Sequence, residues 1–135
     1  MIQFDSSFLV DLREEIAREA PGPAFELIES LDPGEILAVS VHAVAELRVG
    51  AELAKHQLKM HETTDELLAG FLTIYPDKRF AAAYARLWVA TNRLRRTVPA
   101  MDLLIATAAI VEDASLVTRN VKDFSRIPGL RITRY

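Results

Sequence analysis

Short apolar runs alternate with segments of helical periodicity along this 135-residue chain. The predicted strands occupy residues 1–4, 36–39, 72–76, 116–118 and 130–132, and each run ends near a polar or turn-forming residue. Parallel strands need long crossover connections, which are usually helices, and these crossovers are right-handed. The alternation therefore predicts an α/β fold, with a central parallel sheet of four or five strands flanked by helices.

Apolar residues recur at helical spacing in the segments between these strands. The predicted helices include residues 8–12, 25–31, 41–55, 63–72, 77–96 and 101–111. Residues 101–111 are apolar nearly all round, which predicts a buried helix at the centre of the fold.

Length and composition restrict the class of protein. A chain of 135 residues fits one domain, residues 1–135, and half of its residues are hydrophobic. It contains no cysteine, which excludes disulfides and zinc fingers, and no apolar run reaches the roughly 18 residues of a membrane span. We expect a soluble cytoplasmic protein that does not associate with membranes. The net charge of −3 does not argue for or against nucleic-acid binding, because clustered acids would offset a basic surface in the total.

Acidic residues lie where predicted strands give way to helices or loops, or one turn into the following helix. Asp5 follows the first strand, Glu46 lies early in the helix after the second, Asp102 begins the apolar helix and Asp123 follows residues 116–118. In an open α/β sheet the carboxyl ends of the strands converge on one crevice, so acids distant in sequence can meet there.

Each acid also has an ordinary structural explanation. Asp5 is equally suited to cap a helix. Glu46 lies in a run whose apolar content predicts a largely buried helix, where an unpaired carboxylate would cost several kcal/mol, so it needs either a cation or an ion pair with Arg48 or another arginine. Ala43 and Gly50, its neighbours along the helix, should leave a recess beside it.

The other two acidic segments leave alternatives open as well. Asp102 is favoured at a helix start by the helix dipole, although its apolar neighbours carry it into the centre of the fold. Asn120 and Asp123 are three residues apart, so either can supply a fourth ligand. Asn120 can instead satisfy a turn through its side chain, and Asp123 can be a solvated acid beside Lys122.

Together the acids indicate a metal site. If Asp5, Glu46 and Asp102 meet within about 5 Å, each pair of charges repels by roughly 3 kcal/mol at an effective dielectric constant near 20. A divalent cation removes this repulsion. Ligands that are all oxygen select Mg²⁺ or Mn²⁺, ions that bind phosphate and activate water for attack on a phosphodiester.

The four segments resemble those of the PIN-domain ribonucleases, and among these the VapC-type toxins of toxin-antitoxin pairs. The resemblance spans the chain and rests on the order and spacing of Phe4-Asp5-Ser6-Ser7, residues 40–50, Asp102-Leu103-Leu104-Ile105-Ala106-Thr107-Ala108, and Thr118-Arg119-Asn120-Val121-Lys122-Asp123-Phe124 followed by Pro128-Gly129-Leu130.

The resemblance implies a PIN-like three-layer fold, an endoribonuclease that uses Mg²⁺ or Mn²⁺ and water, an antitoxin partner and a homodimer. It implies that Asp5, Glu46 and Asp102 are the core acids and metal ligands. Where some PIN domains have an aspartate, this chain has Asn120, so Asp123 is expected to supply the fourth catalytic acid. Ser6 and Thr118 are further polar residues expected near this fourth position, which we call the fourth corner of the site.

Basic and aromatic side chains near residue 93 offer a surface for RNA. Arg93, Arg95 and Arg96 are candidates to bind RNA phosphates, or they form a solvated helix end. Tyr84 and Trp88, spaced along one helical stripe, are expected in the core or in an interface.

Two further functions are consistent with acids at strand ends. The first is a PIN-like module that binds protein and is catalytically weak or inactive, for which Asn120 is the motivating change. The second is a phosphoacceptor domain of receiver type. Such a domain needs adjacent acids after its first strand, whereas Asp5 is followed by two serines.

Overall fold

The computed structural model describes residues 1–95 and 97–135 and contains one five-stranded parallel sheet. The strands, in the spatial order β3-β2-β1-β4-β5, are β1 (Ile2–Phe4), β2 (Leu37–Ser40), β3 (Leu72–Ile74), β4 (Ser115–Val117) and β5 (Ile132–Thr133). The prediction of a parallel sheet flanked by helices is confirmed.

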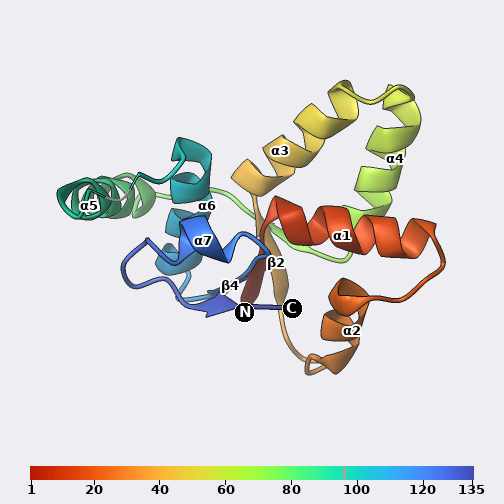
Figure 1. Cartoon of the computed structure of the whole chain (residues 1–135), viewed down its shortest axis with the longest axis horizontal. Coiled ribbons are helices and arrows are strands. Elements are labelled where there is room, and N and C mark those ends of the chain that lie inside the picture. The colour runs from red at the N-terminus through yellow and green to blue at the C-terminus, as the bar shows by residue number, and fades with distance from the viewer. Residues whose placement is uncertain (96) are drawn as a thin grey trace.

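Helices connect the strands and lie on both sides of the sheet. They are α1 (Ser6–Ala17), α2 (Pro23–Ser30), α3 (Val41–Glu52), α4 (Gln57–Leu68), α5 (Phe80–Arg93), α6 (Ala100–Val111) and α7 (Val121–Phe124). Helices α5, α6 and α7 lie on one side of the strands, and α1, α2 and α4 lie on the other (Figure 1). None of the helices in the described part of the chain is long and apolar enough to cross a membrane.

The strand register brings three chain segments to one edge of the sheet. Phe4, at the end of β1, is level with Val39 in β2 and with Val117 in β4. Because all three strands run in the same direction, the residues that follow them, including Asp5 and Thr118, lie together at the carboxyl edge.

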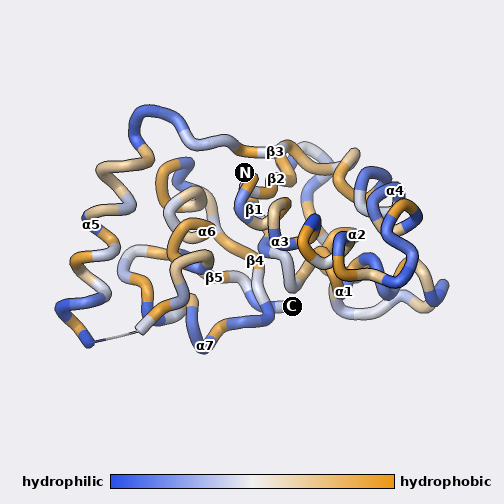
Figure 2. Tube along the Cα trace, turned by 90° about the horizontal axis from the view of Figure 1, so that it is seen from above, coloured by the Kyte–Doolittle hydropathy of each residue, from blue (hydrophilic) through white to orange (hydrophobic). Residues whose placement is uncertain are grey.

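The hydrophobic core lies between the sheet and its helices. Hydrophobic residues gather in the strands and in α6 (Figure 2). Phe4 packs against Phe8 with a centroid distance of 4.5 Å, and Ile105 and Ala109 of α6 are buried in the same cluster. Gln3, fully buried in β1, donates from Nε2 to the carbonyl oxygen of Ala108 at 3.0 Å. This bond holds α6 against the central strand.

A side chain of α1 stabilises the start of α2. The carboxylate of Glu15 accepts hydrogen bonds from the backbone N–H groups of Gly22, Ala24 and Phe25, at 3.0, 3.1 and 2.8 Å. No side chain of the residue before α2 caps this helix, so Glu15 serves in its place.

Several predicted boundaries and burials differ from the structure. Helix α4 begins at Gln57, whereas the predicted helix began at residue 63. Helix α5 begins at Phe80 and ends at Arg93, inside the predicted range 77–96. The predicted RNA-binding residue Arg96 lies outside the described residues. Helix α3 was expected to be largely buried, but Val49 and Leu53 are exposed, because α3 and α4 form a hairpin that projects from the sheet. Trp88 is half-exposed and so is not part of the core.

Candidate active site

Asp5 combines a helix cap, one of the two roles that its position suggested, with a place at the carboxyl edge of the sheet. The structure places this buried residue directly after β1, where it is the N-cap of α1. Its Oδ1 accepts hydrogen bonds from the N–H group of Phe8 at 3.0 Å and from Oγ of Ser7 at 2.7 Å. Its Oδ2 accepts a hydrogen bond of 2.5 Å from Oγ1 of Thr118. The cap therefore holds one oxygen of Asp5, while the other faces the neighbouring strand end.

Glu46 reaches the same edge of the sheet from α3. Its Oε2 accepts a hydrogen bond of 2.5 Å from Oγ of Ser6, and its side chain is only partly buried, in contrast to the burial expected from the sequence. Arg48, which offered an ion pair, instead binds Asp65 and the ring and carbonyl oxygen of His61. Across residues 1–95 and 97–135, no lysine or arginine forms an ion pair with Glu46.

Asn120 lies between two acids at the fourth corner. Its Nδ2 donates to Oδ2 of Asp102 at 3.3 Å and to Oδ2 of Asp123 at 3.1 Å. Its backbone N–H donates to Oγ1 of Thr118 at 2.9 Å, and the same hydroxyl group donates to Asp5. The amide and the acid are therefore both present at this corner, and Asn120 joins the two acids to each other.

The carboxylates are close enough to affect one another's ionisation. Burial, followed by the charges of Glu46, Asp123 and Asp5, raises the pKa of Asp102 to about 6. Burial also raises the pKa of Asp5, and the charge of Glu46 adds to this effect, although the hydrogen bonds to Asp5 oppose it. The site therefore concentrates negative charge where water is partly excluded.

The donor set of this cluster is made of oxygens, which suits a hard divalent cation. Within the described part of the chain, however, no three acidic or histidine side chains are already arranged to hold a metal ion. The physical reason is that the carboxylates face neutral donors of the protein: Thr118 for Asp5, Ser6 for Glu46 and Asn120 for Asp102. A cation would have to exchange with these hydrogen bonds.

A pocket of about 240 Å³ opens beside Glu46. Gly50 lines it, and a methyl group added at Gly50 would meet no atom within 4 Å, so the recess expected beside the carboxylate is present on this side. Arg13 and Arg119 also line the pocket. Neither arginine was predicted from the sequence to be a site residue. Arg13 falls on the same helical face as Ser6, seven residues earlier, and this spacing is the signal that would have identified it.

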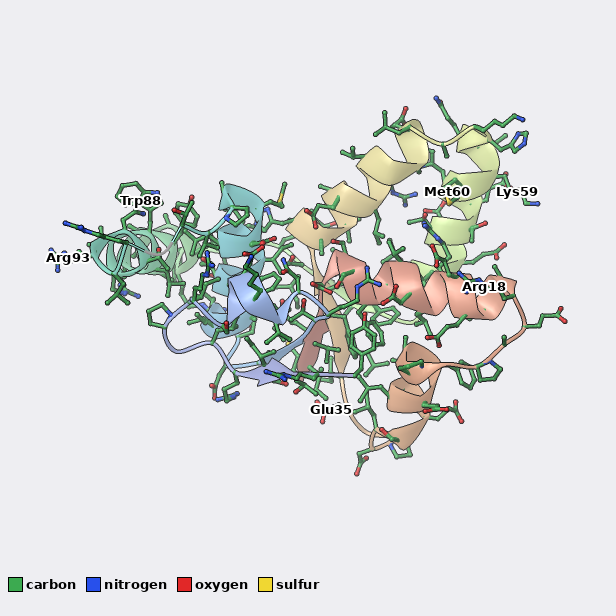
Figure 3. The ribbon with its side chains drawn as sticks, viewed as in Figure 1. Arg18, Glu35, Lys59, Met60, Trp88 and Arg93 are labelled. Carbon is green, nitrogen blue, oxygen red and sulfur yellow. The ribbon has the colours of Figure 1, made fainter. Side chains whose placement is uncertain are left out.

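The arginines predicted to bind RNA do not join the acid cluster. Arg93 projects from α5 near one end of the molecule, as Trp88 does (Figure 3). Arg95 lines a separate pocket of about 280 Å³ together with Trp88 and Leu103. Among the described residues, neither Arg93 nor Arg95 forms a hydrogen bond or ion pair with an acid of the site.

Comparison with known proteins agrees with the fold. Residues 2–130 match the family model of the PIN domain. The chain is 31% identical to ribonuclease VapC2 of Rickettsia felis over 110 residues, which cover 82% of each chain.

Two solved complexes contain chains of the same architecture. The crystal structure of VapBC2 from Rickettsia felis, bound to a DNA fragment from its promoter, matches with a TM-score of 0.89 and 28% identity, covering 100% of this chain and 99% of the other. The structure of VapBC-1 from nontypeable Haemophilus influenzae matches with a TM-score of 0.86 and 26% identity, covering 99% and 98%. The chain belongs to the PIN-domain family and, within it, to the VapC type.

Proposed function

We propose that this protein is a metal-dependent endoribonuclease and the toxin of a toxin-antitoxin pair. The observation that carries the proposal is the meeting of four carboxylates, those of Asp5, Glu46, Asp102 and Asp123, at the carboxyl edge of one sheet. The charges of the other three act on Asp102. Such a cluster is costly without a cation, and the ribonuclease relatives favour RNA as the substrate.

Asp5, Glu46 and Asp102 would hold Mg²⁺ or Mn²⁺, with Asp123 and Asn120 completing the site. When bound, the ion lowers the pKa of water and neutralises phosphate charge. Asp5 is the most rigid ligand, because the cap of α1 and Thr118 fix its carboxylate. Asn120 holds Asp102 and Asp123 in place and donates its N–H hydrogens towards acids whose charges repel. Ser6 donates a hydrogen bond to Glu46 and so orients its carboxylate towards the site.

The decisive experiment measures cleavage of single-stranded RNA with Mg²⁺, with Mn²⁺ and with a chelator. We expect Asp5→Asn and Asp102→Asn to lower cleavage by at least a hundredfold, because each removes a charged ligand. Asp113→Asn is the matched control, since Asp113 is an exposed acid that pairs with Arg131 before β4, at the opposite edge of the sheet. Titration with Mn²⁺ should show saturable binding to the wild type and to Asp113→Asn.

Full activity in both ligand variants would overturn the proposal. A protein that neither binds Mn²⁺ nor cuts RNA would instead be a PIN-like protein-binding module. Membership of the PIN-domain family makes the receiver-type phosphoacceptor the less favoured alternative, and treatment with a small phosphodonor followed by mass measurement tests it directly.

We also propose an antitoxin partner and a homodimer. The structural relatives are VapBC complexes, and large apolar side chains, including Leu53, Leu58 and Tyr75, are exposed on this chain. Co-expression with the product of the neighbouring open reading frame should restore growth and yield a stable complex. Light scattering of the purified protein should give the mass of two chains; a single-chain mass would contradict the homodimer.

A further inference from the structure

Two arginines face the pocket beside the acid cluster, one from α1 and one from the loop after β4. Ser6, Val10 and Arg13 follow one another on the same face of α1 and line the pocket on one side. Glu46 and Gly50 of α3 line it on another side. The pocket is therefore lined by one acid of the proposed metal site, Glu46, and by two arginines, Arg13 and Arg119.

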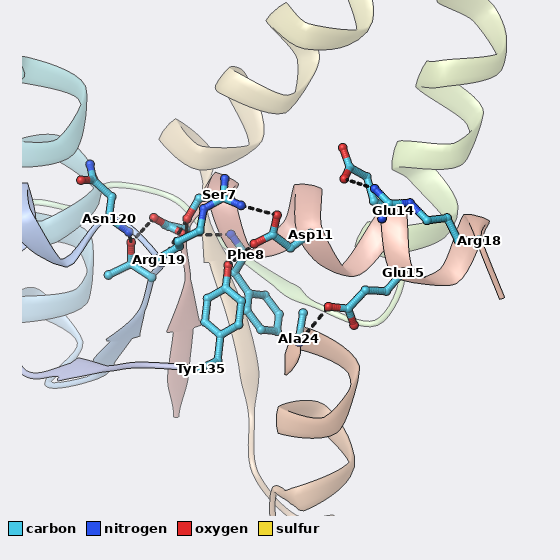
Figure 4. Close-up of polar contacts among 12 residues, drawn as sticks. Ser7, Phe8, Asp11, Glu14, Glu15, Arg18, Ala24, Arg119, Asn120 and Tyr135 are labelled. Atoms are coloured by element: carbon cyan, nitrogen blue, oxygen red, sulfur yellow. Dashed lines mark hydrogen bonds and ion pairs between the residues drawn. The ribbon is translucent and has the colours of Figure 1, made fainter. Parts of the chain in front are cut away.

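Two side chains, those of Asp11 and Ser7, accept hydrogen bonds from Arg119. Its Nη1 donates to Oδ1 of Asp11 at 2.7 Å, while Oδ2 of Asp11 accepts a hydrogen bond of 2.6 Å from the hydroxyl group of Tyr135 (Figure 4). Its backbone N–H donates to Oγ of Ser7 at 3.3 Å, and the same Ser7 donates to Asp5. Arg119 is thus held in place although its side chain is 64% exposed, and its remaining N–H groups are available to a ligand.

Arg13 supplies a second positive charge without an acidic partner among the described residues. It is partly buried, and its side chain lines the pocket together with Glu46 and Arg119. Asp11 pairs with Arg119 and offsets its charge, so the positive charge of Arg13 is the one that no acid balances among the described residues. With a cation on Glu46, the charge remaining in the pocket is positive.

We propose that Arg13 and Arg119 form a binding site for a backbone phosphate of single-stranded RNA next to the phosphate that is cut. The inference rests on the proposed nuclease function and adds to it the residues that place the strand. Guanidinium groups recognise phosphate through paired N–H donors, and Gly50 leaves room for the chain to pass. A phosphate held here lies beside the acids, so the next phosphodiester can reach them.

The test uses Arg13→Gln, Arg119→Gln and the double variant, with Arg131→Gln as the matched control. Arg131 loses the same charge, but it pairs with Asp113 at the opposite edge of the sheet. For cleavage of a mixed-sequence single-stranded RNA, we expect KM to rise about tenfold for each single pocket variant, the usual effect of losing one charge-assisted hydrogen bond, with a smaller change in kcat. Arg119→Lys should recover part of the loss, since it restores charge but not the paired donors.

Binding of the same RNA in an Asp102→Asn background supplies a second readout. The slope of log affinity against log salt should decrease by about 0.7 for each arginine removed, the value for one phosphate contact to a single strand. Mn²⁺ affinity, measured in the Asp102 wild type, should be unchanged, and melting curves should show that the variants are folded.

The outcomes separate this inference from the proposed function. If the wild type cuts RNA and the pocket variants keep its KM and salt slope, the phosphate site is wrong and the nuclease remains. If the wild type does not cut RNA, the proposed function fails, and the salt slope still decides whether the two arginines contact phosphate. Equal effects of Arg131→Gln would show only a general charge effect and would overturn the inference.

Discussion

The hydroxyl group of Thr118 donates a hydrogen bond of 2.5 Å to Oδ2 of Asp5 and so joins the ends of the neighbouring strands β4 and β1. Oγ1 of Thr118 also accepts a hydrogen bond from the backbone N–H of Asn120. One buried side chain therefore connects the first acid of the chain to the loop that carries the fourth corner of the site.

Replacement of Thr118 by valine keeps the shape of the side chain but removes this donor and acceptor. The buried carboxylate of Asp5 and the N–H of Asn120 each lose a partner, so we expect a loss of about 1–3 kcal/mol in the free energy of unfolding, measured with urea. Thr118→Ser should restore most of it. Thr107→Val is the control: its hydroxyl group is also buried but bonds a carbonyl of its own helix, so a similar loss there would contradict the assigned role.

Removal of the charge of Asp102 should stabilise the metal-free protein. Burial and the neighbouring acids raise its pKa to about 6 from an ordinary 3.8, so the folded state disfavours the ionised form. The free-energy cost of ionising Asp102 in the folded state is absent below pH 3.8, grows as the pH rises to about 6 and is constant above that. At pH 7 we expect Asp102→Asn to raise the free energy of unfolding by on the order of 1 kcal/mol, allowing for screening by solvent at this half-buried site.

The measurement for Asp102 is urea unfolding in a chelator at pH 4, 5, 6 and 7, and again with Mn²⁺. The gain should appear only as the pH rises, and Mn²⁺ should stabilise the wild type but not the variant. A gain that is the same at every pH would show that the carboxylate has no electrostatic penalty in the folded state.

The cap formed by Glu15 should make the start of α2 sensitive to acid. Burial raises the pKa of Glu15, but the N–H groups of Phe25, Ala24 and Gly22 lower it by more, so its net pKa lies below the ordinary 4.5. Its contribution to stability is therefore present above pH 4.5 and is lost as the pH falls through the lowered pKa. We expect Glu15→Gln to lower the melting temperature at pH 7 by about 4 °C, the effect of losing one helix cap.

The neighbouring Glu14 is the matched control for this cap. Glu14 forms an exposed ion pair with Arg18, so Glu14→Gln should change the melting temperature little. The difference between the two variants should shrink in acid. If they melt alike at pH 7, Glu15 does not cap α2.

His42 should make the packing of α3 against α5 dependent on pH. Its ring lies 5.4 Å from that of Phe80, its buried Nε2 has no hydrogen-bond partner among the described atoms, and burial lowers its pKa. The unfolded chain takes up a proton near pH 6.5, before the folded protein does, so stability falls as the pH drops below this value. His42→Phe should reduce that fall between pH 8 and pH 5, whereas a variant of the exposed His56 should not.

The sequence predicted those parts of the fold that depend on local pattern. The alternation of apolar runs and helical periodicity was sufficient for the parallel sheet. Hydrogen bonds link the segment at Asp5 to Glu46 and the segment at Asp102 to that of Asp123, whereas the role of the four acids as a metal site stays a prediction. The start of α4 was less predictable, because polar and apolar side chains alternate over residues 57–61, a pattern that does not have helical periodicity.

The network around the acids could not be derived from the sequence. Local spacing does not show that Ser6 binds Glu46 or that Asn120 bridges Asp102 and Asp123, because these contacts depend on the packing of four separate helices, α1, α3, α6 and α7. The burial of α3 was overestimated for a related reason: an apolar composition does not reveal whether a second layer covers the helix. Arg13 and Arg119 acquire their significance only from the pocket that they share.

The order of segments around this site has a consequence for biosynthesis. Asp5 is translated 113 residues before Thr118, and Asn120 and Asp123 follow later still. During synthesis, the nascent protein therefore carries its first acids without the strand end that positions them. A site divided in this way is completed only after the loop that follows β4 has been translated, so a chain truncated before that loop would lack the proposed activity.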